Sequence, residues 1–250
     1  MNRFTSAFAV AFFTGGSAWA LDIASCGADV PPGQVGVLQA DLTCASTTAA
    51  VELEDLATLQ MNGHSISGAG TGVFCFVRCT VQGPGEIVGA ANFGIVTSTN
   101  PRPRVLVEDV TIRDGAGSAI AFGAPGLLDL TNVTVDNNGA GVSATNAGRI
   151  RGTNVVITNN ANGGAGARRL RFTGLTLQGN GAPGLVSFRG GVHLVDSTLT
   201  GNNSGMGDLD LATRRRPGVY NTTCGRSARV PDPPAVPAPT DPSWGICTND

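Results

Sequence analysis

The sequence predicts an all-β protein that folds as a right-handed parallel β-helix, a solenoid with about 22 residues per coil. Three observations carry this prediction. A motif of one turn residue followed by a strand-forming segment recurs every 20–23 residues. An asparagine recurs at a fixed place after most copies. Each period also holds three short apolar segments, which suffice for one coil of three strands but are too short for two helices and a turn.

The copies of the motif begin at Asp109, Asn132, Asn154, Gly174 and Asp196. Alternation along each strand places every second residue inside the coil. Stacked coils then bury continuous aliphatic columns, in which each buried side chain contributes roughly 1.5–3 kcal/mol. The residue two positions into each motif is expected outside, where its β-propensity and cross-strand pairing favour the sheet. This outer column consists of Thr111, Thr134, Val156, Thr176 and Thr198.

The recurring polar column follows three residues after each motif. It consists of Gly115, Asn138, Asn160, Asn180 and Asn202. We expect the asparagine amides to hydrogen-bond from coil to coil, as amide ladders do in stacked strands. Asparagine also tolerates the left-handed conformation of a sharp turn. The next strand of each coil is expected around Ile120, Val142, Ala165, Leu185 and Met206.

Residues 1–20 have the pattern of a secretory signal peptide. They contain one basic residue, Arg3, an apolar run over residues 7–13, and the A-x-A sequence Ala18-Trp19-Ala20. The run is shorter than the ~20 residues of a membrane span, and no later segment is long enough. We therefore expect a secreted protein, extracellular or periplasmic, without a membrane span.

The remaining chain is expected to form a solenoid with a cover at each end, because an open end exposes apolar core and unpaired strand edges. We assign residues 21–56 to an N-terminal cap, residues 57–225 to the β-helix and residues 226–250 to a C-terminal closure. The closure contains six prolines and cannot form a central strand. It is expected to run back over the last coil.

Six cysteines follow the expected cleavage site, and an even number in an exported chain favours disulfides. They are Cys26, Cys44, Cys75, Cys79, Cys224 and Cys247. We favour sequential pairing, because each such pair flanks a short local loop. A zinc site is disfavoured, since the chain has no C-x-x-C pair and only two histidines. No cofactor is expected. Calcium is an alternative, although no three carboxylates converge on one coil.

Several segments match a known repeat pattern. Leu59-Gln-Met-Asn-Gly-His-Ser-Ile66 is similar to an L-x-L-N-G-H-T-I coil, and Thr80-Val-Gln-Gly-Pro-Gly-Glu-Ile87 to the coil that follows it. Asn221-Thr-Thr-Cys-Gly-Arg-Ser227 with Trp244-Gly-Ile-Cys247 is similar to a C-terminal closure. Together they resemble the right-handed parallel β-helix repeat proteins that bacteria secrete, which share the pectate-lyase superfamily fold. The resemblance covers about residues 55–225. It implies the fold but not the activity, because this fold hosts lyases, hydrolases, epimerases, adhesins and inert stalks.

The resemblance places a ligand along the outer face of one parallel sheet, formed by the strands just before each motif. Their inward residues are expected to be Leu128, Leu130, Leu170, Phe172, Val192 and Leu194. One outward column is then Arg104, Leu127, Arg149, Arg169, Gly191 and Asp208. The second is Leu106, Asp129, Arg151, Arg171, His193 and Asp210. Four arginines therefore crowd two adjacent coils, which stack ~4.8 Å apart.

Like charges that face each other destabilise a sheet, so Asp129, solvent or an anionic ligand should offset the arginines. Guanidinium groups bind carboxylates and sulfates bidentately. The predicted ligand is an acidic polysaccharide or a cell-envelope glycan. The predicted binding residues are Asp129, Arg149, Arg151, Arg169, Arg171, His193, Asp208 and Asp210. The alternative is a solvated charged face on a non-catalytic structural or cell-surface solenoid.

If the protein is an enzyme, a polysaccharide lyase is favoured over a glycoside hydrolase. Arg151 and Arg171 could neutralise a uronate carboxylate, and His193 could be the base. A hydrolase would instead use Asp208 and Asp210, roughly 7 Å apart as alternate residues of one strand. Against catalysis, the characteristic segments of pectate lyases and polygalacturonases are absent. The net charge of −2 gives no support for nucleic-acid binding. We expect a monomer.

Overall fold

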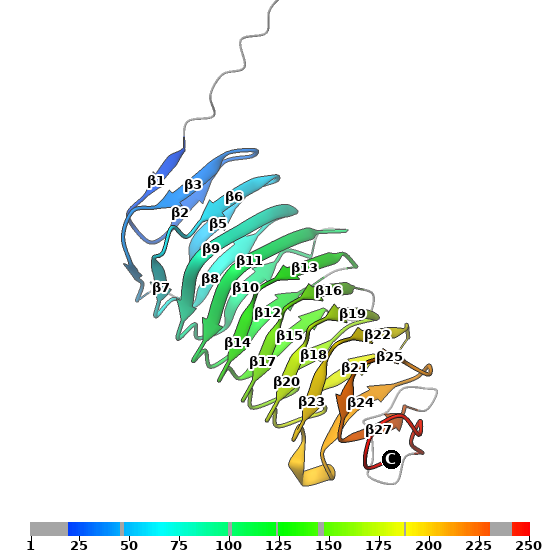
Figure 1. Ribbon diagram of the computed structural model, residues 1–250. Coiled ribbons are helices and arrows are strands. Elements are labelled where there is room, and N and C mark those ends of the chain that lie inside the picture. The colour runs from blue at the N-terminus through cyan, green and yellow to red at the C-terminus, as the bar shows by residue number, and fades with distance from the viewer. Residues whose placement is uncertain are drawn as a thin grey trace, which may run out of the picture.

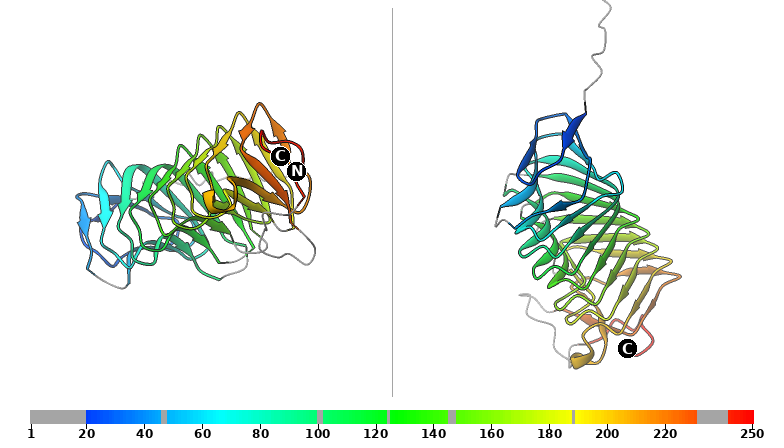
Figure 2. Two further views of the ribbon diagram at one scale, coloured as in Figure 1. Left: turned by 90° about the horizontal axis from the view of Figure 1, so that it is seen from below. Right: turned by 90° about the vertical axis from the view of Figure 1, so that its left-hand side faces the viewer.

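The computed structural model describes residues 20–45, 48–99, 102–123, 125–144, 148–187, 189–230 and 242–250. These residues form a stack of coils whose strands pair in parallel within two sheets, so the predicted parallel β-helix is confirmed. Figure 2 shows the same stack from two further directions. The expected signal peptide lies outside the described residues, except for its last residue. Within the described ranges, no helix has the length and apolar character to cross a membrane.

The larger sheet has 17 strands in two rows, which the long strands β9 and β11 bridge. The first row contains β1 (Leu21–Ile23), β3 (Val35–Leu38), β6 (Ala57–Gln60), β9 (Arg78–Val88), β11 (Arg104–Arg113), β13 (Leu127–Thr131), β16 (Arg149–Thr153), β19 (Arg169–Thr173), β22 (Val192–Val195) and β25 (Gly218–Tyr220). The second row adds β4 (Leu42–Thr43), β7 (Ser65–Ser67), β14 (Thr134–Asp136), β17 (Val156–Thr158), β20 (Thr176–Gln178), β23 (Thr198–Thr200) and β26 (Thr223–Cys224).

The smaller sheet has ten strands and closes each coil. It contains β2 (Ala28–Val30), β5 (Ala49–Leu53), β8 (Thr71–Cys75), β10 (Phe93–Thr97), β12 (Ser118–Phe122), β15 (Ala140–Ala144), β18 (Ala165–Gly166), β21 (Leu185–Ser187), β24 (Leu209–Thr213) and β27 (Arg226–Arg229). The division of the chain into an N-terminal cap, a β-helix from residue 57 and a C-terminal closure from residue 226 stays a prediction. Residues 21–56 nevertheless contribute β1 to β5, which pair in parallel with one another or with later coils.

The core lies between the two sheets and runs the length of the stack. The inward residues predicted for the first row, among them Leu128, Leu170 and Phe172, are all buried. The outer column of the second row is also confirmed, since Thr134, Val156 and Thr176 pair in register and each precedes a buried residue of its strand. Alternation along each strand therefore places both faces correctly.

The turn residues that begin each motif adopt a left-handed backbone. Asp109, Asn132, Asn154, Gly174, Asp196 and Asn221 have φ values between 45° and 68°. Asparagine, aspartate and glycine are the residues that reach this region most easily. The side chains also link coils, because the Nδ2 of Asn132 donates to Asp109 at 2.8 Å and that of Asn154 donates to Asn132 at 3.2 Å.

The predicted asparagine ladder is present and buried. Asn138, Asn160, Asn180 and Asn202 are at most 3% exposed. The Oδ1 of Asn160 accepts two hydrogen bonds from Asn138, one from the backbone N–H at 3.0 Å and one from the side-chain Nδ2 at 3.2 Å. Asn180 and Asn202 repeat this pattern in the following coils. One expectation is wrong: the ladder residues are not left-handed themselves. The left-handed position precedes them, at Asn137, Asn159, Gly179 and Gly201.

The ladder ends on a buried carboxylate. The Oδ1 of Asp210 accepts the N–H of Asn202 at 3.2 Å and its Nδ2 at 2.6 Å, while Oδ2 accepts the N–H of Gly225 at 2.5 Å. Burial raises the pKa of Asp210, and the hydrogen bonds from Asn202 and Gly225 act in the opposite direction. The amide dipoles point their donor ends toward Asp210, so the ladder supplies this carboxylate with donors where no next asparagine follows.

The repeat period fails in the coil after β23. A 3-10 turn, η1 (Ser204–Met206), is inserted there, and Leu211 rather than Met206 pairs with Leu185. The prediction for Met206 is therefore wrong. The insertion also delays the next strand of the first row, which begins only at Gly218.

All six cysteines form the predicted sequential disulfides, Cys26–Cys44, Cys75–Cys79 and Cys224–Cys247. The third holds the C-terminal segment on the last coil, where Ile246 and Cys247 pack against the core. The carboxylate of Asp250 fastens this segment further. It accepts the N–H and hydroxyl of Ser227 and the N–H groups of Ile246 and Cys247, at 2.5–2.9 Å.

Replacing Asn160 with alanine should lower the free energy of unfolding by about 1–3 kcal/mol, because its ladder partners in both adjacent coils are left unpaired in the core. Thr134→Ala, on the outer face, is the control and should cost much less. Urea denaturation measures both. Equal losses for the two variants would contradict the assigned roles of the two columns.

Acid should loosen the C-terminal segment. Burial alone would raise the pKa of Asp250, but hydrogen bonds from Ser227, Cys247 and Ile246 outweigh it and hold the pKa below the ordinary value of 3.8. A lowered pKa in the folded state stabilises above the unfolded pKa, and this stabilisation is lost as the pH falls through the folded value.

Hydrogen-exchange protection of the Ile246 and Cys247 amides should therefore fall as the pH is lowered from about pH 5 to about pH 1, because the pKa of folded Asp250 lies below the ordinary value. In Asp250→Asn this change should be absent, with low protection throughout. Constant wild-type protection over the same range would show that the Asp250 carboxylate does not hold the segment.

Candidate functional site

The structure brings four predicted arginines together on the outer face of the first row. Arg149 pairs in register with Arg169, and Arg151 with Arg171, on the adjacent strands β16 and β19. All four side chains are exposed, because alternate residues of these strands point away from the core. We call Arg149, Arg151, Arg169 and Arg171 the arginine block. Its members stack one coil apart, ~4.8 Å, and lie two residues apart along each strand, roughly 7 Å.

Two further predicted residues border the block. Asp129 precedes Arg151 in the second outer column, and His193 follows Arg171. The His193 ring lies over Gly218 of the next coil, so closely that a side-chain Cβ at Gly218 would approach it to 3.3 Å. The exposed imidazole therefore leans toward Gly218, while the backbone of His193 pairs in register with Arg171.

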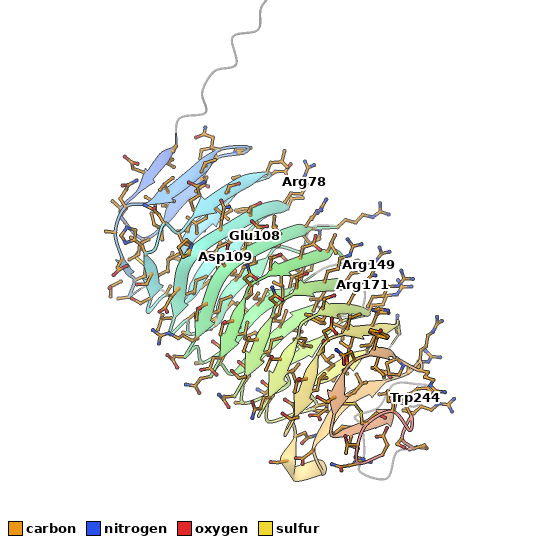
Figure 3. All side chains as sticks on the ribbon, viewed as in Figure 1. Arg78, Glu108, Asp109, Arg149, Arg171 and Trp244 are labelled. Atoms are coloured by element: carbon orange, nitrogen blue, oxygen red, sulfur yellow. A yellow bond between two sulfur atoms is a disulfide. The ribbon has the colours of Figure 1, made fainter. Side chains whose placement is uncertain are left out.

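The preceding arginines of the same row, Arg78 and Arg104, are paired with carboxylates, whereas the block is not. A 2.6 Å ion pair joins Arg78 to Asp55, and Arg104 reaches Asp129 at 3.6 Å. Among the described residues, no carboxylate lies within 4.0 Å of a block guanidinium. Figure 3 shows Arg78, Arg149 and Arg171 along the same edge of the solenoid. Among the described strand residues of this row, the arginines without a carboxylate partner are therefore those of β16 and β19.

A strip of hydroxyl groups, which was not predicted from the sequence, runs beside the block. Thr131, Thr153 and Thr173 pair in register on the same outer face. Together with Asp129, Arg151 and Arg171 they line a shallow groove. Guanidinium and hydroxyl groups in parallel columns can bind a ligand that carries both acidic groups and hydroxyls. The strip could have been predicted, because Thr153 and Thr173 lie two residues after Arg151 and Arg171 and therefore face the same side of the sheet.

Further arginines lie in the turns that lead into this row, and the sequence analysis missed these too. Arg168 precedes β19, and its N–H bonds to the carbonyl of Gly148 in the turn before β16. Arg102 and Arg168 line a second groove with Arg104 and Arg149. Arg189 precedes β22, and Arg215 and Arg216 precede β25, all of them exposed. Most arginines of the chain thus follow one edge, although the net charge is −2.

Asp208 and Asp210 do not join this face, which corrects two predicted site residues. Asp210 belongs to β24 of the ten-stranded sheet and is buried at the end of the asparagine ladder. Asp208 lies in the turn before β24, with a left-handed φ of 56°. The inserted turn η1 shifted the period, so Asp210 falls in the other sheet and Asp208 in the turn that leads into it. The position after His193 belongs instead to Gly218.

No protein-family model matches the chain, and no curated protein matches it. The part of the chain that the structure describes contains no group of three His, Cys, Asp or Glu side chains placed to hold a metal ion. With Asp208 and Asp210 elsewhere, the hydrolase pair has no place on the arginine face. Among the described residues, the groups present there are guanidinium, hydroxyl, one imidazole and the carboxylates of Asp129 and Glu108, the second of which pairs in register with Thr131.

Proposed function

We propose that this protein binds an acidic polysaccharide or cell-envelope glycan along the outer face of β16 and β19. The observation that carries the proposal is the arginine block, four exposed guanidinium groups in register with no carboxylate partner among the residues that the structure describes. Mutual repulsion makes such an arrangement unfavourable in the free protein. Carboxylates or sulfates on a polymer would relieve it and accept bidentate hydrogen bonds. The threonine strip supplies hydroxyl partners for the sugar.

The proposed setting is outside the cytoplasm, as a secreted monomer with the right-handed coil of the pectate-lyase-like fold. Three disulfides in a chain of 250 residues support this setting, because disulfides persist in oxidising compartments. The small net charge argues against nucleic acid as the partner.

Cleavage of the bound polymer is a second candidate function, and the pairing of His193 with Arg171 favours it. In a lyase reaction the imidazole would remove the proton beside a uronate carboxylate while Arg151 and Arg171 hold that carboxylate. The bond to the leaving sugar oxygen breaks, a carbon–carbon double bond forms, and water protonates the leaving oxygen. A non-catalytic structural or cell-surface solenoid is the alternative, and it needs no role for His193.

The double variant Arg151→Gln/Arg171→Gln should lose retention on polygalacturonate or alginate resin. We expect a drop in affinity of about tenfold or more, ~1.4 kcal/mol, because two charge-assisted contacts are removed. Arg113→Gln is the matched control, since Arg113 lies on another edge and is paired with Glu86 and Asp114. It should bind like the wild type, and salt should weaken binding of both.

Failure of the wild-type protein to bind either resin at low salt would contradict the proposal. Incubation with the same polymers tests cleavage, through the ultraviolet absorbance of the unsaturated product. An increase that His193→Gln abolishes while binding persists supports a lyase. Binding without any increase supports the non-catalytic role.

A further inference from the structure

Tyr220 is the most exposed large hydrophobic side chain among the described residues, at 72%. It is the last residue of β25, the strand that follows β22 in the first row. Exposure of a single apolar residue is common and needs no explanation by itself. Tyr220, however, lies on the face that carries the arginine block, where a ligand of the block could reach its ring.

Tyr220 continues the threonine strip. Thr173 pairs in register with Val195, and Val195 pairs with Tyr220, so the tyrosine stands two coils beyond Thr173 on the same outer face. From Arg171 it is two coils and two residues away, roughly 12 Å. Its carbonyl accepts the N–H of Asp196 at 3.1 Å and the hydroxyl of Thr222 at 2.9 Å. The backbone is thus held in place while the ring faces solvent.

Exposed charge also continues from the block toward Tyr220. On the N-terminal side the strand residues Arg78 and Arg104 are paired with carboxylates, and the exposed Arg102 lies in the turn before β11. On the C-terminal side the exposed His193 follows the block, and the exposed Arg215 and Arg216 precede β25. A linear polyanion on the block would therefore gain contacts by extending across the strands toward the last coil.

We propose that Tyr220 is a ring-stacking residue and that the ligand is a linear acidic glycan lying along the solenoid axis. The inference rests on the proposed function and makes it more specific. Acidic groups occupy the arginine block, and a sugar ring farther along the chain packs its C–H face against the phenol. A rigid aromatic side chain offers a large contact area at little entropic cost. This arrangement selects a glycan over other polyanions and requires a chain that spans roughly 12 Å.

The test compares Tyr220→Ala with the full-length wild type by calorimetric titration with three probes: a long galacturonate oligomer, the galacturonate dimer and polyphosphate. For the long oligomer the dissociation constant should rise about threefold to tenfold, as expected from loss of an aromatic contact. For the dimer and for polyphosphate it should not change. Tyr220→Phe should retain wild-type affinity, because the ring and not the hydroxyl makes the contact.

Leu56→Ala is the matched control, because Leu56 is 57% exposed and lies beside the paired arginines at the other end of the face. It should bind all probes like the wild type. Unchanged affinity of Tyr220→Ala for the long oligomer would overturn the stacking role while leaving the proposed function intact. Equal weakening for polyphosphate, or loss in Tyr220→Phe, would also overturn it. A wild type that binds none of the galacturonate probes would overturn both proposals.

Discussion

Coil-to-coil register is the constraint on which the structure depends. Each residue of a coil stacks ~4.8 Å from its equivalent in the next coil, so a periodic sequence becomes a set of columns of like side chains. Aliphatic columns gain from this arrangement because they exclude water from a continuous core. Amide columns gain because each asparagine donates to the next. Arginine columns gain no stability, since the register places equal charges opposite each other.

The asparagine ladder and the arginine block are thus opposite results of the same stacking. In the ladder, Asn138 to Asn202 satisfy one another inside the protein, and Asp210 ends the series as an acceptor on both oxygens. In the block, Arg151 and Arg171 have no such partner among the described residues. Binding sites often carry side-chain arrangements that lower the stability of the free protein, because selection for function outweighs the loss of stability there. The block is therefore the part of this face that an external anionic partner would stabilise most.

Much of this could be predicted from the sequence because the period is regular between residues 104 and 200. Alternation placed Phe172 inside and Arg171 outside, and the spacing of Asn160 predicted the ladder. The prediction for Asp210 failed where the 3-10 turn η1 lengthened one coil, so that counting forward by a fixed period reached the wrong sheet. Thr153 was missed because threonine is also an ordinary strand residue. Tyr220 lies beyond the same irregular coil, and Arg168 lies in a turn, where alternation assigns no face.

The most direct test of this account is a double-mutant cycle on Arg151 and Arg171 in the ligand-free protein, measured by urea denaturation. If the register places their charges opposite each other, each single replacement by glutamine relieves the same repulsion. The gains in free energy of unfolding from the two single replacements should then sum to about 0.2–1 kcal/mol more than the gain from the double replacement at low salt. Screening should remove the difference at high salt. Additive effects at low salt would contradict the claim that stacking forces these two guanidinium groups together without a counter-charge.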